Sequence, residues 1–366
     1  MNKANLLHPA SRPVKLVLQD GTEWNGWSFG SETPQAGEVV FNTAMTGYPE
    51  SITDASYRGQ ILVLTYPLIG NYGVPGKERE NGMLKYFESE SIHISGLIIS
   101  DYSFDFSHWN ADQSLADWLK EFNIPGIYGI DTRTLTKHLR EEGAMLGKIV
   151  FDEDIPFVNP NLLNLVDQVS TKEIIRYGKG KYKILLVDCG VKNNIIRCLL
   201  KRDTEVIRVP WDTDFESIEY DGLFISNGPG DPKQCEITIS NIRKAIAGDK
   251  PIFGICLGNQ LMGLAAGGDT YKLKYGHRSH NQPVLKLGTN KAYITSQNHG
   301  FALDDTTLPD GWDPLFRNLN DQTNEGIQHR TKPFFSSQFH PEASSGPTDT
   351  EFLFDEFIGN IQNTKN

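Results

Sequence analysis

A cysteine between two glycines is the feature of the sequence that points most directly to chemistry. The pentapeptide Gly-Ile-Cys-Leu-Gly at 254–258 has the G-x-nucleophile-x-G spacing of a nucleophile elbow, with Cys256 as the nucleophile. An apolar run at 251–255 predicts a strand before it, and a helix is expected from about Asn259. The helix N-terminus would favour a thiolate, and the N–H of Leu257 would stabilise an oxyanion. Taken alone, the pentapeptide fits a buried structural cysteine equally well.

A histidine and a glutamate two residues apart form a second constellation. His340 and Glu342 lie in Gln-Phe-His-Pro-Glu, after the apolar run at 333–337. Residues two apart in an extended segment point to the same side, so the carboxylate could orient the imidazole. By itself this pattern favours a surface histidine near a turn. In a chain that also carries Cys256, it predicts a Cys–His–Glu triad.

Two polar segments offer further groups to such a site. The turn Ser-Asn-Gly-Pro-Gly-Asp-Pro at 226–232 follows a predicted strand, and its backbone N–H groups could complete an oxyanion hole opposite Leu257. A plain strand-ending turn is an equally good interpretation. The segment Gln-Asn-His-Gly-Phe at 297–301 has amide and backbone groups suited to a small polar ligand. In isolation, however, we expect it to be a hairpin loop.

Metal and nucleotide sites are not expected on this chain. The segment 70–77 departs from a P-loop because its glycines are six apart and Glu78 follows the lysine. No G-x-G-x-x-G opens a helix. His277 and His280 lack a third ligand at suitable spacing, so we expect both to be loop residues.

The elements that must position these groups differ between the two halves of the chain. The second half alternates strands with helices, which implies βαβ units and a parallel sheet covered on both faces. Its predicted strands are at 183–188, 204–209, 222–226 and 251–255, with helices at 193–201 and 237–246. The first half has many strands and few helices. Its predicted strands are at 14–18, 38–41, 60–65 and 96–100, with helices at 114–122 and 132–142.

The change of pattern predicts two domains. We place the first at 12–150 and the second at 183–362, with a linker at 151–182 that contains prolines and a short helix near 162–169. The length of 366 residues suits two or three domains.

Charge, hydrophobic patterning and cysteine content argue against a nucleic-acid-binding, membrane or secreted protein. There are 35 basic and 46 acidic residues, and the net charge of −11 makes nucleic acid and membrane surfaces unexpected partners. No apolar run reaches the roughly 18–20 residues that span a bilayer, and the polar start at 1–13 does not resemble a secretory signal. Four cysteines without a C-x-x-C pair favour free thiols in the cytoplasm.

Together the motifs resemble the class I, triad-type glutamine amidotransferases, through the segments 226–232, 254–260 and 340–342. The first half is similar to the N-terminal domain of carbamoyl-phosphate synthase small subunits, through the segments 37–48, 64–73 and 131–136. The resemblance therefore covers nearly the whole chain. It implies an α/β fold, with a mainly parallel sheet in the C-terminal amidotransferase domain and a strand-rich, mixed α/β N-terminal domain.

The resemblance also implies roles for individual residues. Cys256 would attack the side-chain amide of glutamine, His340 would act as base and then as acid, and Glu342 would orient His340. Gly228 and Leu257 would supply oxyanion N–H groups, with Gly230 close by. The residues expected to hold the glutamine are Ser56, Gln260, Asn298, Gly300 and Phe301.

The activity implied is glutamine hydrolysis through a cysteine thioester. The ammonia would pass to a large subunit in a heterodimer, which makes carbamoyl phosphate from bicarbonate and ATP for pyrimidine and arginine synthesis. ATP and Mg²⁺ are expected on that subunit, and no cofactor on this chain. The sequence departs from the common pattern at Asn259, where histidine is more usual, and at 279–283. The alternatives are a stand-alone γ-glutamyl cysteine hydrolase and a catalytically inactive structural subunit.

Overall fold

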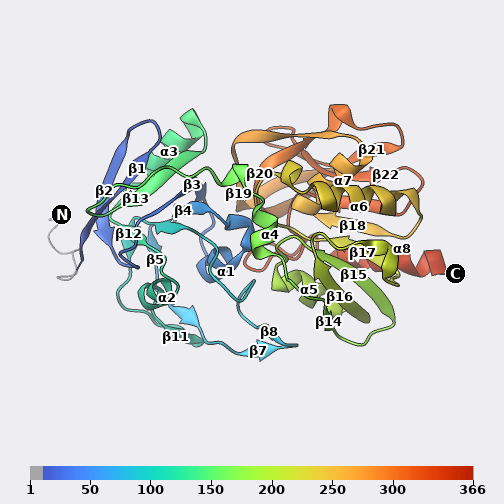
Figure 1. The fold of residues 1–366 in the computed structure, drawn as a ribbon, viewed down its shortest axis with the longest axis horizontal. Helices are drawn as coiled ribbons and strands as arrows, with labels where there is room; N and C mark the ends of the chain where they lie inside the picture. Colours follow the sequence, from blue (N-terminus) through green and yellow to red (C-terminus); the bar gives the residue numbers. More distant parts are fainter. Residues whose placement is uncertain (1–10, 366) are drawn as a thin grey trace.

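The computed structural model describes residues 11–365, and over that range the chain forms two bodies that pack side by side (Figure 1). The first, drawn from blue to green, is built on a closed barrel, and the second, drawn from yellow-green to red, on one large sheet. The first ten residues, which carry most of the polar start used to argue against a secretory signal, lie outside the described residues. None of the described helices has both the length and the apolar character that crossing a bilayer requires.

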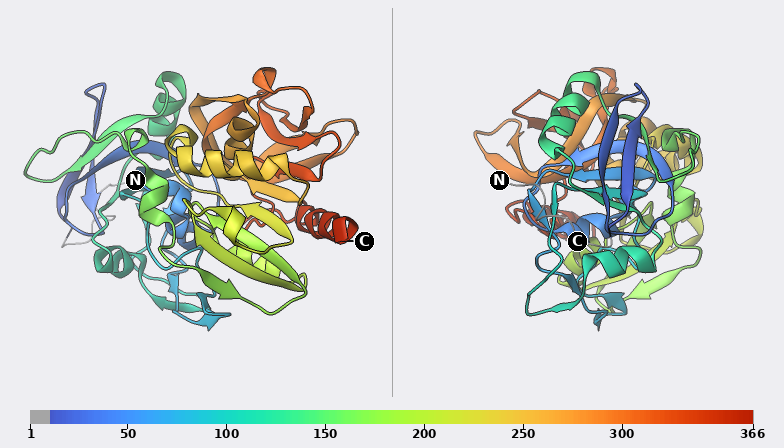
Figure 2. Two further views of the ribbon diagram at one scale, coloured as in Figure 1. Left: turned by 45° about the vertical axis from the view of Figure 1, so that its right-hand side comes forward. Right: turned by 90° about the vertical axis from the view of Figure 1, so that its left-hand side faces the viewer.

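Seven strands close the barrel of the first body, in the order β1-β13-β3-β4-β9-β12-β2. They are β1 (Pro13–Leu18), β2 (Glu23–Ser28), β3 (Gln35–Asn42), β4 (Gln60–Leu64), β9 (Gly96–Ile98), β12 (Gly126–Tyr128) and β13 (Met145–Val150). Alternate residues of β1, namely Val14, Leu16 and Leu18, are buried in an apolar core, as the period of a strand requires. The four strands predicted in this half are confirmed. In the right-hand view of Figure 2 the barrel faces the viewer.

The two longest helices of the first body begin at residues whose side chains cap them. Ser114 accepts a hydrogen bond from the backbone N–H of Asp117, and Asp131 accepts one from that of Thr134. Both helices predicted here are confirmed. The helices are α1 (Tyr48–Thr53), η2 (Ala55–Tyr57), α2 (Leu115–Glu121) and α3 (Thr132–Glu142). The short strands are β5 (Leu68–Ile69), β6 (Val74–Pro75), β7 (Arg79–Glu80), β8 (Met83–Leu84), β10 (Asp101–Tyr102) and β11 (Ala111–Gln113).

The second body is a ten-stranded sheet in the order β14-β16-β15-β17-β18-β23-β22-β21-β19-β20. The five strands from β16 to β23 are mutually parallel, and the pairs outside them are antiparallel. The strands are β14 (Ile175–Tyr177), β15 (Tyr182–Asp188), β16 (Thr204–Pro210), β17 (Gly222–Ile225), β18 (Ile252–Ile255), β19 (Asp269–Lys286), β20 (Ala292–Asp304), β21 (Trp312–Asn318), β22 (Asn324–His329) and β23 (Phe334–Ser337).

Helices cover both faces of this sheet, as the alternating pattern predicts. Ile184 and Leu186 of β15 face a core shared with α5 and α8, whereas Leu185 and Val187 face a core shared with α6 and α7. The helices are α5 (Asn193–Leu200), α6 (Glu236–Ala247), α7 (Leu257–Ala266) and α8 (Phe352–Lys365), with short turns η4 (Phe215–Ser217), η5 (Pro232–Gln234) and η6 (Asp305–Thr307). The C-terminal helix α8 lies at the end of the sheet away from the barrel (Figure 2).

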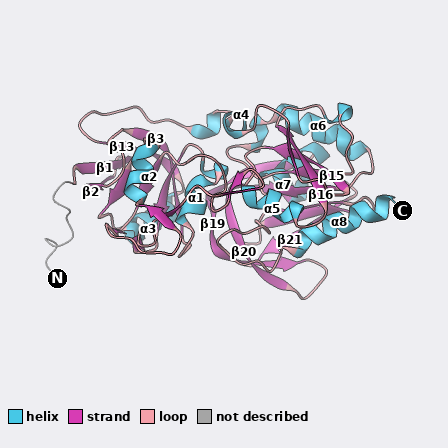
Figure 3. Cartoon of the chain, turned by 90° about the horizontal axis from the view of Figure 1, so that it is seen from below, coloured by secondary structure: helices cyan, strands magenta, loops and turns pink. Residues whose placement is uncertain are grey.

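The segment 151–182 is more ordered than a plain connection. It contains η3 (Pro160–Leu162) and α4 (Leu165–Val169), and its strand β14 pairs antiparallel with β16. The expected short helix near 162–169 is thus present as two pieces. In Figure 3, α4 lies over the junction of the two bodies. This segment therefore contributes a strand to the second sheet as well as joining the halves.

Three local expectations were wrong. The helix after Cys256 begins at Leu257, not near Asn259, because Cys256 itself is the N-cap. The segment 297–301 is not a hairpin loop but part of β20, since its backbone pairs with β19. His277 and His280 likewise lie within β19 rather than in a loop. Buried polar residues along this strand pair obscured the hydrophobic alternation on which strand prediction depends.

Candidate active site

Cys256 lies at a sharp turn between β18 and α7. Its backbone has φ 55° and ψ −103°, a conformation that is strained for any residue with a side chain. Non-glycine residues with positive φ outside the left-handed helical region are rare, and they cluster at functional sites where the surrounding fold enforces the strain. The side chain is buried, and the Sγ atom lies 3.7 Å from the backbone oxygen of Asn298. The strand-to-helix turn expected from the pentapeptide is therefore present.

The flanking glycines allow the backbone to pack closely at this turn. A Cβ atom on Gly258 would lie 2.3 Å from the backbone oxygen of Ile225, and one on Gly254 would lie 2.7 Å from the backbone of Gly258. Neither contact can be relieved by turning a side chain. We therefore expect Gly258→Ala to lower the free energy of unfolding by about 1–3 kcal/mol, as measured by urea denaturation.

A matched control for that substitution is available in α8. A Cβ atom on Gly359 would meet nothing within 4 Å, so Gly359→Ala removes a glycine from a helix without a clash. It should be neutral or stabilising by up to about 1 kcal/mol. If the two substitutions had equal effects, the close approach of α7 to β17 would not be the reason for glycine at 258.

His340 and Glu342 form a buried pair next to Cys256. The Nδ1 atom of His340 donates a hydrogen bond of 2.7 Å to Oε1 of Glu342, and the two side chains are 1% and 0% exposed. The backbone of His340 pairs with that of Ser296, which fixes the position of the ring. Its Nε2 atom is buried without a conventional hydrogen bond, and the Cys256 thiol is close enough to raise the pKa of the imidazole. The three residues predicted as a triad are thus brought together.

Charge shifts the pKa values of this pair in opposite directions. Burial by itself would lower the pKa of His340, but the Glu342 carboxylate and the Cys256 thiol raise it to about 10. Burial by itself would raise the pKa of Glu342, but the positive charges of Lys192 and His340 lower it to about 2. The geometry therefore favours an imidazolium held against a carboxylate.

Lys192 is a residue of this site that sequence reasoning missed. Its Nζ atom lies 3.0 Å from Oε1 of Glu342, and its side chain is 8% exposed. The negative charges of Glu342, Glu88 and Asp54 raise the pKa of Lys192, although burial opposes them. The sequence signal that could have identified Lys192 was its place just after β15, at the same edge of the parallel sheet as Cys256.

The contribution of His340 to stability should depend on pH. Because its folded pKa of about 10 lies above the ordinary value of 6.5, this contribution is complete below 6.5 and is lost as the pH rises through 10. We therefore expect the difference in unfolding free energy between the wild type and His340→Gln to shrink over that range. Chemical denaturation at several pH values measures it, and a difference that grows toward high pH would contradict the charged pair.

A cavity opens beside Cys256, between the barrel and the sheet. Its lining includes every residue expected to hold glutamine or the oxyanion except Leu257, which follows Cys256 directly. These expected residues are Ser56, Gly228, Gly230, Gln260, Asn298, Gly300 and Phe301. Residues that sequence reasoning missed also line the cavity, namely Glu38, Gln60, Asn161, Arg278 and His299.

A hydrogen-bond network holds the two bodies together at this cavity. The side chain of Asn227 donates to Ser56 Oγ at 3.0 Å, and that of Asn298 donates to the Asp54 carboxylate at 2.9 Å. Asp54 also accepts a hydrogen bond from the backbone N–H of Ser56. Asp54 was not expected from the sequence. It fixes the turn that carries Ser56 and anchors a strand of the opposite body.

Asn259, one of the positions that depart from the common family pattern, lies within packed structure. Asn259 is buried, donates to Gln338 Oε1 at 2.9 Å and accepts from Ser336 Oγ at 2.7 Å. Gln260 donates to the backbone oxygen of Phe301 at 2.8 Å. Asn259 therefore ties α7 to β23, and it is Gln260 that reaches the cavity.

Comparison with known proteins relates each half of the chain to a family model. The model described as "Glutamine amidotransferase class-I" matches residues 185–360, which include Cys256, His340 and Glu342. The model described as "Carbamoyl-phosphate synthase small chain, CPSase domain" matches residues 16–149, which include Ser56. The cavity therefore lies where the two matched regions meet.

Individual relatives match nearly the whole chain. The arginine-specific small chain of carbamoyl phosphate synthase from Saccharomyces cerevisiae is 51% identical, over 96% of this chain and 90% of the yeast protein. A human mitochondrial carbamoyl-phosphate synthase whose name specifies ammonia is 53% identical over 98% of this chain, but the chain spans only 24% of that protein. The multifunctional protein CAD of Squalus acanthias is 54% identical over 94% of this chain, which spans 16% of it.

Proposed function

The chain belongs to the carbamoyl-phosphate synthase small-chain family, and on this premise we propose that it hydrolyses glutamine and supplies ammonia to a synthase large subunit. One observation carries the proposal. Cys256 sits in a strained strand-to-helix turn, beside a cavity and next to the buried pair of His340 and Glu342. A nucleophile, a base and a group that orients the base are the parts that acyl transfer requires.

The chemistry follows from these positions. His340 takes the proton of the Cys256 thiol, and the sulfur attacks the side-chain amide carbon of glutamine. The oxyanion that forms is stabilised by the N–H groups of Leu257 and Gly228. His340 donates a proton to the leaving nitrogen, and ammonia departs. The resulting thioester is hydrolysed by a water molecule that gives its proton to His340. Glutamate leaves, and the thiol is regenerated.

The cavity also suits the charged end of the substrate. Glutamine is a zwitterion, and the lining holds one buried cation and one buried anion, Arg278 and Glu38. Ser56, Asn298 and the backbone of Gly300 add hydrogen-bonding groups. We assign Arg278 to the α-carboxylate and Glu38 to the α-ammonium group.

The proposed partner is a large subunit that makes carbamoyl phosphate from bicarbonate and ATP, with Mg²⁺ bound there. The yeast relative is named a small chain, and the human and shark relatives are several times longer than this chain. The product would serve arginine and pyrimidine synthesis. We place the protein in the cytoplasm, because its four cysteines are buried, unpaired thiols.

Two alternatives predict different behaviour. A stand-alone γ-glutamyl hydrolase would have no need of the small-chain region at 16–149. An inactive structural subunit would need no nucleophile, but here the bonded pair of His340 and Glu342 lies next to Cys256.

Glutamine labelled with ¹⁵N at the side-chain amide separates these possibilities. The chain is assayed alone, with a large subunit, and with a γ-glutamyl peptide as competing substrate. We expect glutamate release that rises with the large subunit, and ¹⁵N in carbamoyl phosphate. Preferred cleavage of the peptide would support the hydrolase. No glutamate release under any condition would support the inactive subunit.

A further inference from the structure

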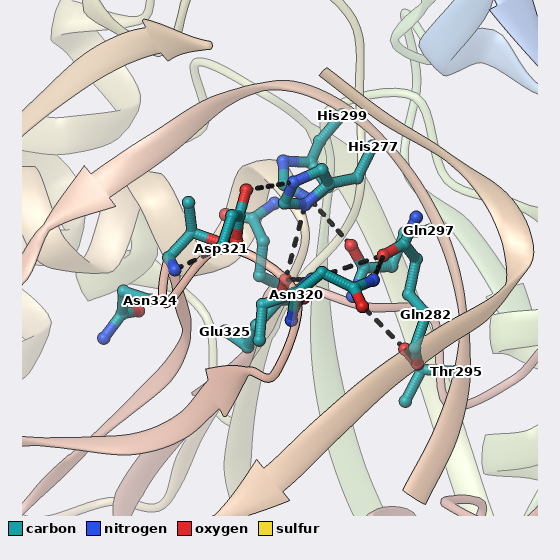
Figure 4. Close-up of polar contacts among 12 residues, drawn as sticks. His277, Gln282, Thr295, Gln297, His299, Asn320, Asp321, Asn324 and Glu325 are labelled. Carbon is teal, nitrogen blue, oxygen red and sulfur yellow. Dashed lines mark hydrogen bonds and ion pairs between the residues drawn. The ribbon is translucent and has the colours of Figure 1, made fainter. Parts of the chain in front are cut away.

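Two histidines and a glutamate from three strands meet beside the glutamine cavity (Figure 4). His277 comes from β19, His299 from β20 and Glu325 from β22. One side-chain nitrogen or oxygen of each lies within 4.8 Å of the others, and all three residues are buried. No third ligand for His277 could be found from spacing, because its two partners lie far along the chain. His280 is not part of this group, since it lines a separate cavity with Lys192 and His340.

Two atoms of the cluster that could bind a metal form no hydrogen bond. Nδ1 of His277 and Oε2 of Glu325 are buried and form no hydrogen bond, although the residues are only 7% and 0% exposed. Leaving such atoms unsatisfied costs about 1–3 kcal/mol each. Nδ1 of His277 lies 3.5 Å from Oε1 of Glu325, so both residues face the same point. An ion at that point would satisfy both atoms.

The outer contacts of the two rings match those of metal-binding histidines. A ligating histidine usually donates its other ring N–H to a carboxylate or a backbone carbonyl. Nε2 of His277 donates to Asp321 at 2.8 Å, and Nδ1 of His299 donates to the backbone oxygen of Phe301 at 2.8 Å. These contacts leave Nδ1 of His277 for an ion, and Nε2 of His299 would exchange its hydrogen bond of 3.2 Å to Gln297 Oε1 for a bond to the ion. Glu325 is held as well, since its Oε1 accepts from Asn318 at 2.9 Å.

We propose that His277, His299 and Glu325 bind one divalent transition-metal ion, and that zinc fits the donor set best. Two imidazoles and a carboxylate are a recurring zinc ligand set. Gln297 Oε1, which lies 3.2 Å from Nε2 of His299, is placed to be a fourth ligand. Tetrahedral zinc bonds of about 2.0–2.1 Å place ligand atoms about 3.3 Å apart. The ligand atoms of the three side chains now lie within 4.8 Å of one another, so they must approach by up to about 1.5 Å.

The ion would support the wall of the glutamine cavity. The Phe301 backbone oxygen that accepts from His299 also accepts from Gln260, and both Gln260 and Phe301 line the cavity. A metal bound to His299 would thus fix the strand that presents Asn298 and Gly300. This role does not depend on the proposed glutamine chemistry, because the cluster touches none of the three triad residues.

The test is zinc binding to the full chain carrying Cys256→Ser, which removes the one thiol that could compete for the ion. Metal-free protein is titrated with Zn²⁺ against a chromophoric chelator, and with Co²⁺ to record its visible spectrum. We expect one ion per chain and the d–d bands of a four- or five-coordinate nitrogen and oxygen site. The Co²⁺ spectrum requires no change within the cluster, so it does not depend on whether variants of the cluster residues fold.

Variants then locate the ion. His277→Gln and Glu325→Gln should each weaken Zn²⁺ binding by at least about 100-fold, and Asp321→Asn by about 10–100-fold, because it acts only through His277. His329→Gln is the control, since His329 lies on β22 outside the cluster and should leave binding unchanged. Absence of the bands, or Zn²⁺ affinity that these cluster variants do not alter, would overturn the proposal. His277 would then be an imidazolium between Asp321 and Glu325.

Discussion

Cys256→Ser is expected to lower glutamate release from glutamine by about 10⁴-fold or more. The reason is chemical, because a serine hydroxyl is a far weaker nucleophile than a thiolate and His340 is placed for a sulfur atom. The fold should be unaffected, since serine has nearly the same volume and can adopt the same backbone. Glutamate release is measured with the large subunit present, and the melting temperature reports on the fold.

The other three cysteines supply the control. Burial raises the pKa of Cys198 and Cys235 to about 12, and it raises that of Cys189 well above its ordinary value. Such thiols are poor nucleophiles. Cys198→Ala should therefore retain glutaminase activity, and iodoacetamide should modify Cys256 first. Glutaminase activity that survives Cys256→Ser would show that Cys256 is not the nucleophile. A loss of activity in a folded Cys198→Ala variant would contradict the assignment as well.

The local parts of this site could be predicted from the sequence. The turn at Cys256 depends on glycines two residues away on either side, and the pairing of His340 with Glu342 spans two residues. Both features are properties of a short stretch of chain, so a spacing pattern is enough to find them. The central parallel strands were predicted for the same reason, because each is a short apolar run between turn residues.

The parts built from distant segments could not be predicted in this way. Lys192 reaches Glu342 only because β15 and β23 lie in the same sheet, and Asp54 reaches Asn298 only because the barrel packs against the sheet. A single sequence contains no pattern that links such positions. Family resemblance placed Ser56 in the site, but it supplied neither of these charged residues.

The strand β20 could not be predicted from the sequence for a different reason. Its residues 297–301 are mostly buried and polar, which suggests a loop when read by composition. They are buried because they line the cavity on one side and meet His277 on the other. The sequence rule for strands assumes one apolar face and one solvated face, and a strand between two polar sites has neither.

His340→Ala is expected to lower glutaminase activity by about 10³–10⁴-fold, and Glu342→Ala by a smaller factor of about 10–10². His340 transfers the protons itself, whereas Glu342 acts by holding the ring through the hydrogen bond to Nδ1. Glu342→Ala should also reduce stability by about 3–5 kcal/mol, because it leaves the buried charge of Lys192 without its partner. Rates are therefore compared at a temperature where all the variants remain folded.

The double substitution Lys192→Met with Glu342→Ala separates the two effects of Glu342. Removing the lysine should restore most of the lost stability, since the buried His340 ring loses its proton once Glu342 is gone and no unpaired charge then remains at this place. Activity should stay low, because the His340 ring is still not oriented. If the double variant regained the wild-type rate, Glu342 would support activity only by stabilising the fold. If Glu342→Ala were as slow as His340→Ala while folded, Glu342 would take part in proton transfer rather than only position the base.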